Sequence, residues 1–302
     1  MATVNPAARG LSARPNPAES FAEACERAAS FDAAALQPLN PLGRTRLLVG
    51  EGPADEVVVL FHGLTNCPYQ MRDIGALLHA RGAAVFVPRL PRHGYADRRN
   101  NGLELLTAEE LRACCDAALD IAVGLGKRIT VAGISAGGVM AAWVAQFRPE
   151  VARAAIIAPS FSFGGRLGVT LGAIQQPLLL TLPNFDITRF DRRRAVILDH
   201  AYYNFPSHAL GQALRLGASV WRAAGSKPPH ARPLHVIINA ADTAVNDDTT
   251  LALVQRWRRV GSAPDVYEFP ASRRLIHDII DPSQPAQQTA LTYPVLLDAL
   301  LH

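Results

Sequence analysis

The chain has 302 residues, of which 49% are hydrophobic, and its 30 basic and 26 acidic residues give a formal net charge of +4. This length and apolar content supply one large core or two modest ones, which excludes a disordered or fibrous chain. No apolar run reaches the roughly 18 residues of a membrane span, and the opening stretch MATVNPAARGLSARP lacks the apolar segment of a signal peptide. We therefore expect a cytoplasmic protein without stable membrane insertion.

Two short basic runs, Arg98-Arg99 and residues 192–194, contain the densest positive charge of the sequence. Neither run is interleaved with aromatic residues that could stack on bases. We therefore predict two solvated surface segments and no nucleic-acid partner.

Short apolar runs alternate with longer segments of helical period from about residue 45 onward. Such alternation predicts a mostly parallel sheet covered by helices. Near-continuous apolar runs such as EVVVLF are typical of strands buried on both faces. The predicted strands span residues 46–49, 56–61, 84–88, 128–133, 154–158, 234–239 and 265–269.

Helix signals lie between these strands. Thr107 and Glu110 form a capping box, and the helix that they begin should run toward Gly126. Asp247 or Asp248 is predicted to cap a later helix. Further helices are predicted over residues 20–35, 71–81, 136–147 and 285–300, the last interrupted by Pro294.

Two regions interrupt the alternation. Residues 1–44 are rich in Ala, Pro and Arg, and we predict an N-terminal extension that is partly helical or mobile. Residues 160–232 contain apolar, glycine-punctuated and aromatic stretches and are predicted to form an inserted cap or lid. Residues 45–159 and 233–302 would then form the core, with the insertion over the carboxyl ends of its strands, where open α/β sheets bind ligands.

The stretch VAGISAGG, residues 131–138, places Ser135 between a predicted strand and a predicted helix. A nucleophile on such a sharp turn crowds its neighbours, and Gly133 and Gly137 would relieve the crowding while the hydroxyl stays accessible. The helix that begins at Ala136 would direct its free N–H groups at negative charge developing beside the serine. The pattern predicts a nucleophilic serine.

Five motifs together resemble the α/β-hydrolase superfamily, and within it the bacterial carboxylesterase and monoacylglycerol-lipase-like branch. The motifs are VVVLFHGLTNCP, PRLPRHG, GISAGG, PLHVIINAADTAV and LIHD. They span roughly residues 45–301, and no motif covers the first 44 residues or the insertion. The resemblance implies an α/β-hydrolase fold: a mostly parallel central sheet flanked by helices, with an inserted cap after the sixth strand.

A serine hydroxyl needs an adjacent general base, and the base needs an orienting carboxylate. His277 follows the predicted strand DVYEF and completes the chain order serine, aspartate, histidine that this fold uses. Asp242 follows LHVIIN, at the end where the resemblance puts the acid. Asp247 and Asp248 compete for that role, but we expect them to cap the next helix. The sequence therefore predicts a triad of Ser135, Asp242 and His277.

The tetrahedral intermediate of acyl transfer carries an oxyanion that two backbone N–H groups usually meet. The resemblance implies that these belong to Leu64, after the HG turn, and to Ala136, after the serine. His62 in the HG turn is predicted to brace its loop, and neither His62 nor His93 is placed to act as the base.

The insertion holds no glutamate between Val151 and Arg232. A peptidase that binds a substrate ammonium would need acidic groups there, so a peptidase is disfavoured. We predict a substrate pocket that includes Leu179, Tyr202 and Trp221, which would suit an acyl chain. The same apolar residues would equally suit core packing.

The sequence predicts a serine hydrolase that cleaves carboxylic esters, with short- to medium-chain acyl groups or monoacylglycerol-like molecules, through an acyl-enzyme. A carbon-carbon bond or other acyl-transfer hydrolase with the same triad, and a non-catalytic ligand-binding protein of this fold, stay open as alternatives. The partner is a small-molecule ester. Because no GxGxxG, Walker or HExxH motif occurs, no cofactor and no metal is implied.

Overall fold

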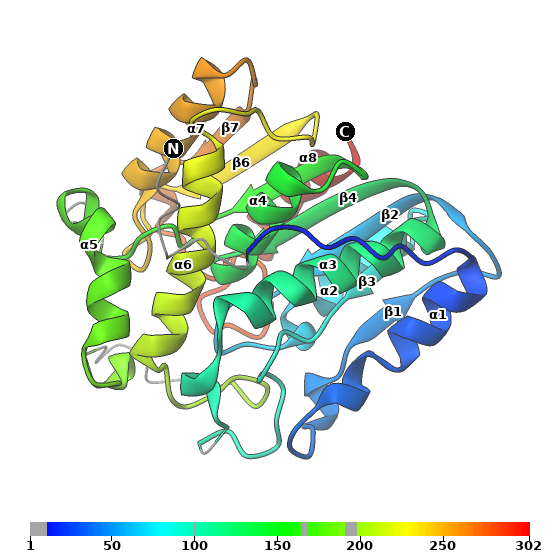
Figure 1. Cartoon of the computed structure of the whole chain (residues 1–302), viewed down its shortest axis with the longest axis horizontal. Coiled ribbons are helices and arrows are strands. Elements are labelled where there is room, and N and C mark those ends of the chain that lie inside the picture. Colours follow the sequence, from blue (N-terminus) through cyan, green and yellow to red (C-terminus); the bar gives the residue numbers. More distant parts are fainter. Residues whose placement is uncertain (1–10, 100, 165–167, 191–197) are drawn as a thin grey trace, which may run out of the picture.

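The computed structural model describes residues 11–99, 101–164, 168–190 and 198–302 (Figure 1). In these residues seven strands form one sheet in the order β1-β3-β2-β4-β5-β6-β7. The strands are β1 (Arg46–Leu48), β2 (Ala54–Phe61), β3 (Ala84–Val87), β4 (Gly126–Ile134), β5 (Val151–Ile157), β6 (Leu234–Asn239) and β7 (Asp265–Phe269). Only β1 pairs antiparallel, and every other neighbouring pair is parallel. The predicted fold class, a mostly parallel sheet with flanking helices, is confirmed.

Helices cover both faces of the sheet, because the central strands are apolar on both sides. One face packs against α2 (Arg72–His79) and α8 (Thr289–Leu301). The other packs against α3 (Ala108–Leu125), α4 (Ala136–Phe147), α6 (Ser207–Ala223) and α7 (Asp247–Arg259), and Figure 1 shows α3, α4 and α6 in front of the sheet. The remaining helices are α1 (Phe21–Ala29), α5 (Gly168–Thr181) and the short 3-10 helices η2 (Phe31–Ala34), η3 (Pro41–Gly43), η4 (Pro68–Met71), η5 (Leu103–Leu105), η7 (Ile187–Phe190) and η8 (Ala271–Arg273).

The bounds of α4, β6 and β7 agree with the sequence prediction, and the capping box of Thr107 and Glu110 begins α3. The cap of α7 differs. Asn246 accepts the hydrogen bond from the Thr249 N–H at 2.8 Å, so the prediction of Asp247 or Asp248 as the cap is wrong. Asn246 is the last residue with extended backbone, and the two aspartates lie in the first turn, where the helix dipole favours negative charge.

The bounds of the other helices differ from the predicted ones by a few residues. The segment predicted as a helix over 71–81 begins as the 3-10 helix η4 and continues as α2 to His79. Pro294 lies inside α8, which begins at Thr289, four residues after the predicted start. Gly126 ends α3 and begins β4 without an intervening loop. Boundaries differ because the ends of elements depend on packing more than on local pattern.

Residues 11–44 pack onto the core. Ser20 caps α1, which lies against α3, and a strap before it is fastened to the same helix by hydrogen bonds from the N–H groups of Ala18 and Asn16 to Asp120. The indole N–H of Trp143 donates to the carbonyl of Leu11 at 3.2 Å. Within this segment Phe21–Ala29 is helical, and residues 1–10 lie outside the described residues.

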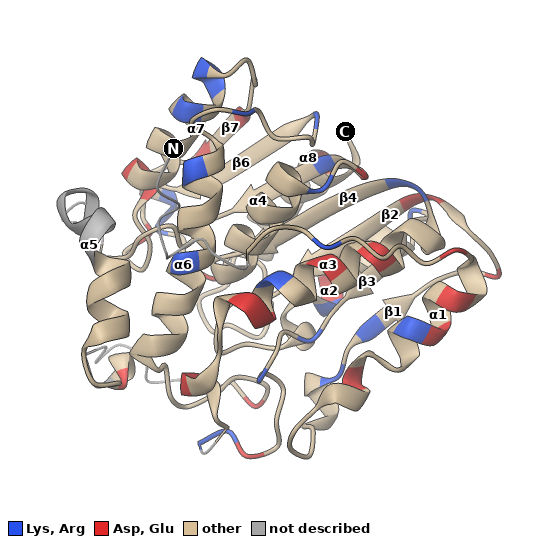
Figure 2. Ribbon diagram, in the orientation of Figure 1, with Lys and Arg blue, Asp and Glu red and all other residues tan. Residues whose placement is uncertain are grey.

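The segment 160–232 lies between β5 and β6, one strand earlier in the chain's own count than the predicted position after the sixth strand. Its helix α6 packs on α4, and α5 packs on α6. The described part of α5 carries no charged residue, and Figure 2 shows few charges along α6. The basic run 192–194 lies outside the described residues, so its role stays a prediction.

The stretch from residue 198 to residue 203 is fastened to the core at several points. The Tyr202 N–H donates to the Thr65 carbonyl at 2.8 Å. Arg98 donates to the carbonyl of Leu198 at 2.6 Å, and its guanidinium lies over the Tyr203 ring. This part of the predicted cap is therefore held by the core, while movement of the remainder as a lid stays a prediction.

None of the helices in the described ranges has the length and apolar content that crossing a membrane requires. The cytoplasmic location stays a prediction.

Candidate active site

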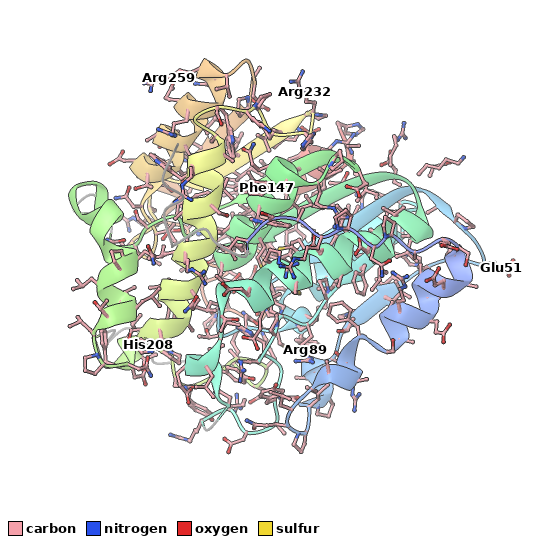
Figure 3. All side chains as sticks on the ribbon, in the orientation of Figure 1. Glu51, Arg89, Phe147, His208, Arg232 and Arg259 are labelled. Atoms are coloured by element: carbon pink, nitrogen blue, oxygen red, sulfur yellow. The ribbon has the colours of Figure 1, made fainter. Side chains whose placement is uncertain are left out.

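The predicted site residues follow four strands at one edge of the sheet. The HG turn follows β2, Ser135 follows β4, Asp242 lies three residues beyond β6, and His277 lies in the loop after β7. These strands run parallel, so their carboxyl ends lie at the same edge. Phe147, labelled in Figure 3, ends α4 at the opposite end of that helix from Ser135.

Ser135 occupies a strained turn between β4 and α4. Its φ of 59° and ψ of −118° are uncommon for a residue with a side chain. Its N–H donates to Ile157 O at 3.1 Å, and its carbonyl accepts from Val139 N and Ser160 N, each at 3.1 Å. Hydrogen bonds on both sides of the residue hold this conformation, a sharp strand-to-helix turn of the kind predicted to present a nucleophile.

The glycines around Ser135 are required by close backbone contacts. A Cβ on Gly133 would collide with the carbonyl of Gly137, and a Cβ on Gly137 would collide with the carbonyls of Phe61 and His62. The turn at Ser135 is therefore packed, backbone against backbone, on the end of β2. A Cβ on Gly63 would lie 3.7 Å from the Ser135 Cβ, so the HG turn adjoins the serine.

Asp242 and His277 form a short hydrogen bond, with the Nδ1–H of the ring donating to the carboxylate Oδ2 at 2.6 Å. The Asp242 side chain is fully buried, while that of His277 is 26% exposed. Burial lowers the pKa of His277, but the charge and hydrogen bond of Asp242, together with the charges of Asp278 and Asp247, outweigh burial and raise its pKa above the usual range. The partly exposed imidazole thus binds a proton more readily than an ordinary histidine side chain.

The carboxylate of Asp242 is stabilised in its ionised form. Burial raises its pKa, but the charge and hydrogen bond of His277 and the N–H groups of Ala244 and Val245 outweigh burial, so the pKa lies below its usual value. Asp247, the competitor in the sequence, lies in the first turn of α7. Burial and then the neighbouring charge of Asp242 raise the pKa of Asp247 to about 7. Of these carboxylates, Asp242 is the one that bonds the imidazole.

The Ser135 hydroxyl makes no hydrogen bond to His277 in the part of the chain that the structure describes. The structure therefore brings Asp242 and His277 into contact and positions Ser135 at the same edge of the sheet. The contact between the hydroxyl and the imidazole stays a prediction, and such contacts are often long without substrate.

Two backbone N–H groups are predicted to bind the oxyanion, those of Leu64 and Ala136. Among the described residues, no hydrogen bond uses either N–H. The Gly63 carbonyl, which shares a peptide plane with the Leu64 N–H, accepts from His62 Nδ1 at 2.9 Å and from Asn66 N at 3.2 Å. Because this carbonyl is held, the direction of the Leu64 N–H is fixed before substrate binds.

His62 and His93 brace this turn as neutral rings. Each donates from Nδ1 to a carbonyl, that of Gly63 or Pro91, and accepts at Nε2 from a backbone N–H, that of Leu90 or Thr65. Burial is the main cause that lowers the pKa of His93 to about 4 and that of His62 well below its usual value. Both rings lack an accessible nitrogen and cannot act as the general base.

Of the three residues predicted to line a pocket, two pack within the protein. Leu179 on α5 is buried and faces Gly211 of α6. The hydroxyl of Tyr202 accepts from Tyr95 N and donates to Arg92 O, each at 2.9 Å, so this buried side chain holds the loop after β3.

Trp221 lies near the last turn of α6, where its ring is 5.1 Å from the Arg256 guanidinium carbon. Figure 3 shows His208, at the start of α6, and Arg259, at the end of α7, far apart in the view. The carbonyl of Trp221 accepts from Arg256 Nε of α7 at 3.1 Å. The structure does not bring Trp221 together with the triad residues.

The sequence interpretation missed three side chains that support the site. Asn239, the last residue of β6, donates to the carbonyls of Leu275 and Ile276 at 3.1 and 3.2 Å and so fastens the loop that presents His277. Gln70 and Asp278 connect that loop to the HG turn. Polar residues within the motifs INAADTAV, HGLTNCPYQ and LIHD were the available signal.

Comparisons with known proteins identify the family and the fold of the chain. The family model described as Alpha/beta hydrolase family matches residues 58–290. A search of curated proteins found no match. Among the similar solved structures is that of the metagenome-derived lipolytic enzymes LipS and LipT, with a TM-score of 0.66 and 20% identity over 87% of this chain and 99% of that chain. Another is that of Paleococcus ferrophilus monoacylglycerol lipase, with a TM-score of 0.61 and 15% identity over 85% of this chain and 97% of that chain.

A third, Est1E from Butyrivibrio proteoclasticus, has a TM-score of 0.53 and 13% identity over 85% of this chain and 94% of that chain. At these identities the structures show a shared fold. The family match covers most of the sequence and includes every residue of the predicted triad. The chain belongs to the α/β-hydrolase family.

Proposed function

We propose that the protein is a serine hydrolase that cleaves carboxylic esters through an acyl-enzyme. The Ser135 hydroxyl oxygen attacks the ester carbonyl carbon as its proton passes to His277 Nε2, and Asp242 stabilises the resulting imidazolium. The carbonyl oxygen becomes an oxyanion that accepts hydrogen bonds from the N–H groups of Leu64 and Ala136.

Collapse of this tetrahedral intermediate expels the alcohol, which takes the proton from His277, and leaves the acyl group on Ser135. A water molecule then gives a proton to His277 and attacks the acyl carbon. Collapse of the second intermediate releases the carboxylic acid and returns the proton to the serine oxygen.

The observation that supports this proposal most strongly is the 2.6 Å bond between His277 and the buried carboxylate of Asp242, at the edge of the sheet where Ser135 occupies a strained turn. Burial alone would lower the pKa of the imidazole, whereas the three nearby carboxylates raise it. An exposed ring that is bonded to a buried carboxylate and lies at the same sheet edge as a strained serine is suited to nucleophilic catalysis.

We further propose an uncharged acyl group as the substrate class, from short-chain esters to monoacylglycerol-like molecules. The described part of α5 has no charged residue, and its Leu178 side chain and that of Leu182, just after it, are exposed. Two of the similar structures are described as lipolytic enzymes and as a monoacylglycerol lipase, in keeping with an ester substrate. A panel of p-nitrophenyl esters of increasing acyl length, compared with matched amides and diketones, would separate ester hydrolysis from the alternatives.

The decisive experiment is Ser135→Ala. We expect an unchanged melting temperature and a loss of p-nitrophenyl ester hydrolysis of about 10⁵-fold or more, because the nucleophile is removed while the fold is not. An active-site-directed fluorophosphonate should label the wild-type chain at Ser135 and leave the variant unlabelled. Ester hydrolysis retained in Ser135→Ala, or a wild-type chain that stays unlabelled, would overturn the proposal.

A further inference from the structure

The buried Gln70 side chain connects two loops: the HG turn, which carries the proposed oxyanion donor, and the loop that carries the proposed general base His277. Its Oε1 accepts the Gly63 N–H at 2.8 Å, and its Nε2 donates to Asp278 Oδ2 at 2.9 Å. Gly63 directly precedes the proposed oxyanion donor Leu64, and Asp278 directly follows His277. We propose that Gln70 is a positioning residue that sets the oxyanion turn and the histidine loop in register, an inference that rests on the proposed function.

The chemistry of the two neighbours requires an amide at this position. The Gly63 N–H can only donate, and an ionised carboxylate can only accept. A glutamine satisfies both because it presents an acceptor on one side and a donor on the other. A glutamate would place a second carboxylate against that of Asp278 and would lose the donor.

Asp278 is held firmly enough to transmit this connection. Its other oxygen, Oδ1, accepts from the N–H groups of Asp281 and Ile280 at 3.1 and 3.3 Å, which fixes the turn that follows His277. Gln284 also donates to Asp278 Oδ2, at 3.1 Å, but among the described residues it makes no hydrogen bond to the HG turn. Loss of Gln70 would therefore disconnect the Gly63 N–H from the histidine loop, while loss of Gln284 would not.

The effect on catalysis should be one of alignment. The bonds of His62 and Asn66 to the Gly63 carbonyl orient the Leu64 N–H within the turn. The Gln70 bonds to the Gly63 N–H and to Asp278 add a fixed position of that turn relative to the histidine loop. A shift of the oxyanion donor relative to the imidazole weakens the transition state more than substrate binding. The predicted signature is a lower kcat with little change in KM.

The test is a double-mutant cycle of Gln70→Glu, Asp278→Asn and the combined variant, assayed on p-nitrophenyl butyrate. Each single change removes the match between donor and acceptor, and we expect kcat to fall about 10- to 100-fold. In the combined variant, the carboxylate introduced at position 70 can accept both from the Gly63 N–H and from the amide introduced at position 278. We expect that variant to recover at least about tenfold in kcat over either single change.

Gln284→Ala is the matched control, since it removes a donor to the same carboxylate and should keep kcat within about threefold of wild type. Should Gln70→Glu fail to fold, Gln70→Met provides the same comparison without added charge. A kcat for folded Gln70 variants within about twofold of wild type, an absence of rescue in the combined variant, or an equal loss in Gln284→Ala would each overturn the inference.

Failure of this inference is distinguishable from failure of the proposed function. Fluorophosphonate labelling of Ser135 in the wild-type chain, together with loss of hydrolysis in Ser135→Ala, supports the proposed function whatever the cycle shows. If the cycle fails while that labelling persists, only the role of Gln70 is wrong.

Discussion

Two groups of charged side chains, one at the carboxyl-terminal end of α4 and one at the carboxyl edge of the sheet, are organised differently. At the carboxyl-terminal end, Arg148 is fully buried and bonds three carboxylates. Its Nη1 donates to Asp116 at 2.9 Å, and its Nη2 donates to Asp120 at 2.6 Å and to Glu150 at 2.9 Å. Asp116 and Asp120 also accept backbone N–H groups of the N-terminal strap.

At the carboxyl edge of the sheet, the pair of Asp242 and His277 is open on one side. Asp242 is fully buried, but 26% of the His277 side chain is exposed, and only one of its ring nitrogens has a partner in the described residues. The pKa of this ring is raised, because the charge and hydrogen bond of Asp242 and the charges of Asp278 and Asp247 outweigh burial. The Arg148 pKa is also raised, since its carboxylates outweigh burial, and that group stays charged at any physiological pH.

The difference separates a structural ionic cluster from a reactive one. The Nη atoms of Arg148 are directed at fixed partners inside the protein, so the cluster fastens α3, the strap and the end of α4 together. The pair of Asp242 and His277 leaves the Nε2 of His277 open to an incoming group. Changes in the first group should alter stability, and changes in the second should alter catalysis.

The largest expected effect is that of Asp242→Asn on catalysis. The amide would favour the wrong imidazole tautomer, and kcat for p-nitrophenyl butyrate should fall by about 10⁴-fold. The melting temperature should change little, because an asparagine oxygen can still accept from Ala244 N. The exposed Asp248→Asn is the matched control. A kcat within about tenfold of wild type in Asp242→Asn would remove Asp242 from the mechanism.

The next largest effect is that of Arg148→Met on stability. Removal of the guanidinium leaves buried carboxylates without their partner, and the free energy of unfolding should fall by about 3–5 kcal/mol in urea titrations. The kcat of the folded fraction should stay near that of wild type. Arg128→Met is the control, since the ion pair of the exposed Arg128 with Glu56 should contribute less than about 1 kcal/mol. Equal losses in the two variants would mean that burial does not distinguish them.

The smallest of the three effects is the loss of stability of the folded chain at low pH. The folded pKa of His93 is lowered to about 4 from an ordinary value of 6.5, so below pH 6.5 the unfolded chain binds the proton that the folded chain excludes. Stability should be fully present above pH 6.5 and should fall by on the order of 3 kcal/mol as the pH drops toward 4.

Urea titrations of wild type and His93→Asn between pH 7.5 and 4.5 would measure this contribution, and the variant should lose part of the slope. The buried His62 contributes in the same direction. His277 has the opposite sign, because its raised pKa means that the folded chain binds this proton more tightly than the unfolded chain, so its contribution to stability is lost as the pH rises. An identical slope in both proteins would show that His93 is not the group that titrates.

Much of the site could be predicted because its signals are local. Gly133 and Gly137 are needed where backbones meet around Ser135, and that requirement leaves the pattern GISAG in the sequence. The choice of Asp242 over Asp247 rested on the resemblance, which puts the acid shortly after the strand LHVIIN. The prediction of the α7 cap was wrong because Asn246 and the two aspartates after it are all good capping residues, and only the backbone angles decide among them.

The substrate side and the connecting network could not be predicted in the same way. Leucines and aromatic residues pack equally well in a core or in a pocket, and the sequence does not say that Tyr202 bonds a core loop while Trp221 lies beside α7. The bond between Gln70 and Asp278 joins residues 208 positions apart. No spacing or period in a single sequence indicates such a contact.

The sequence by itself determined the order of strands and helices and the strained serine, because strand burial, helix capping and steric relief at glycine act between near neighbours in the chain. Tertiary structure decided which carboxylate meets the imidazole, which ring nitrogen stays open and which amide joins the two loops. Those outcomes depend on parallel strands bringing distant segments to one edge, where buried donors and acceptors must find partners across the sheet.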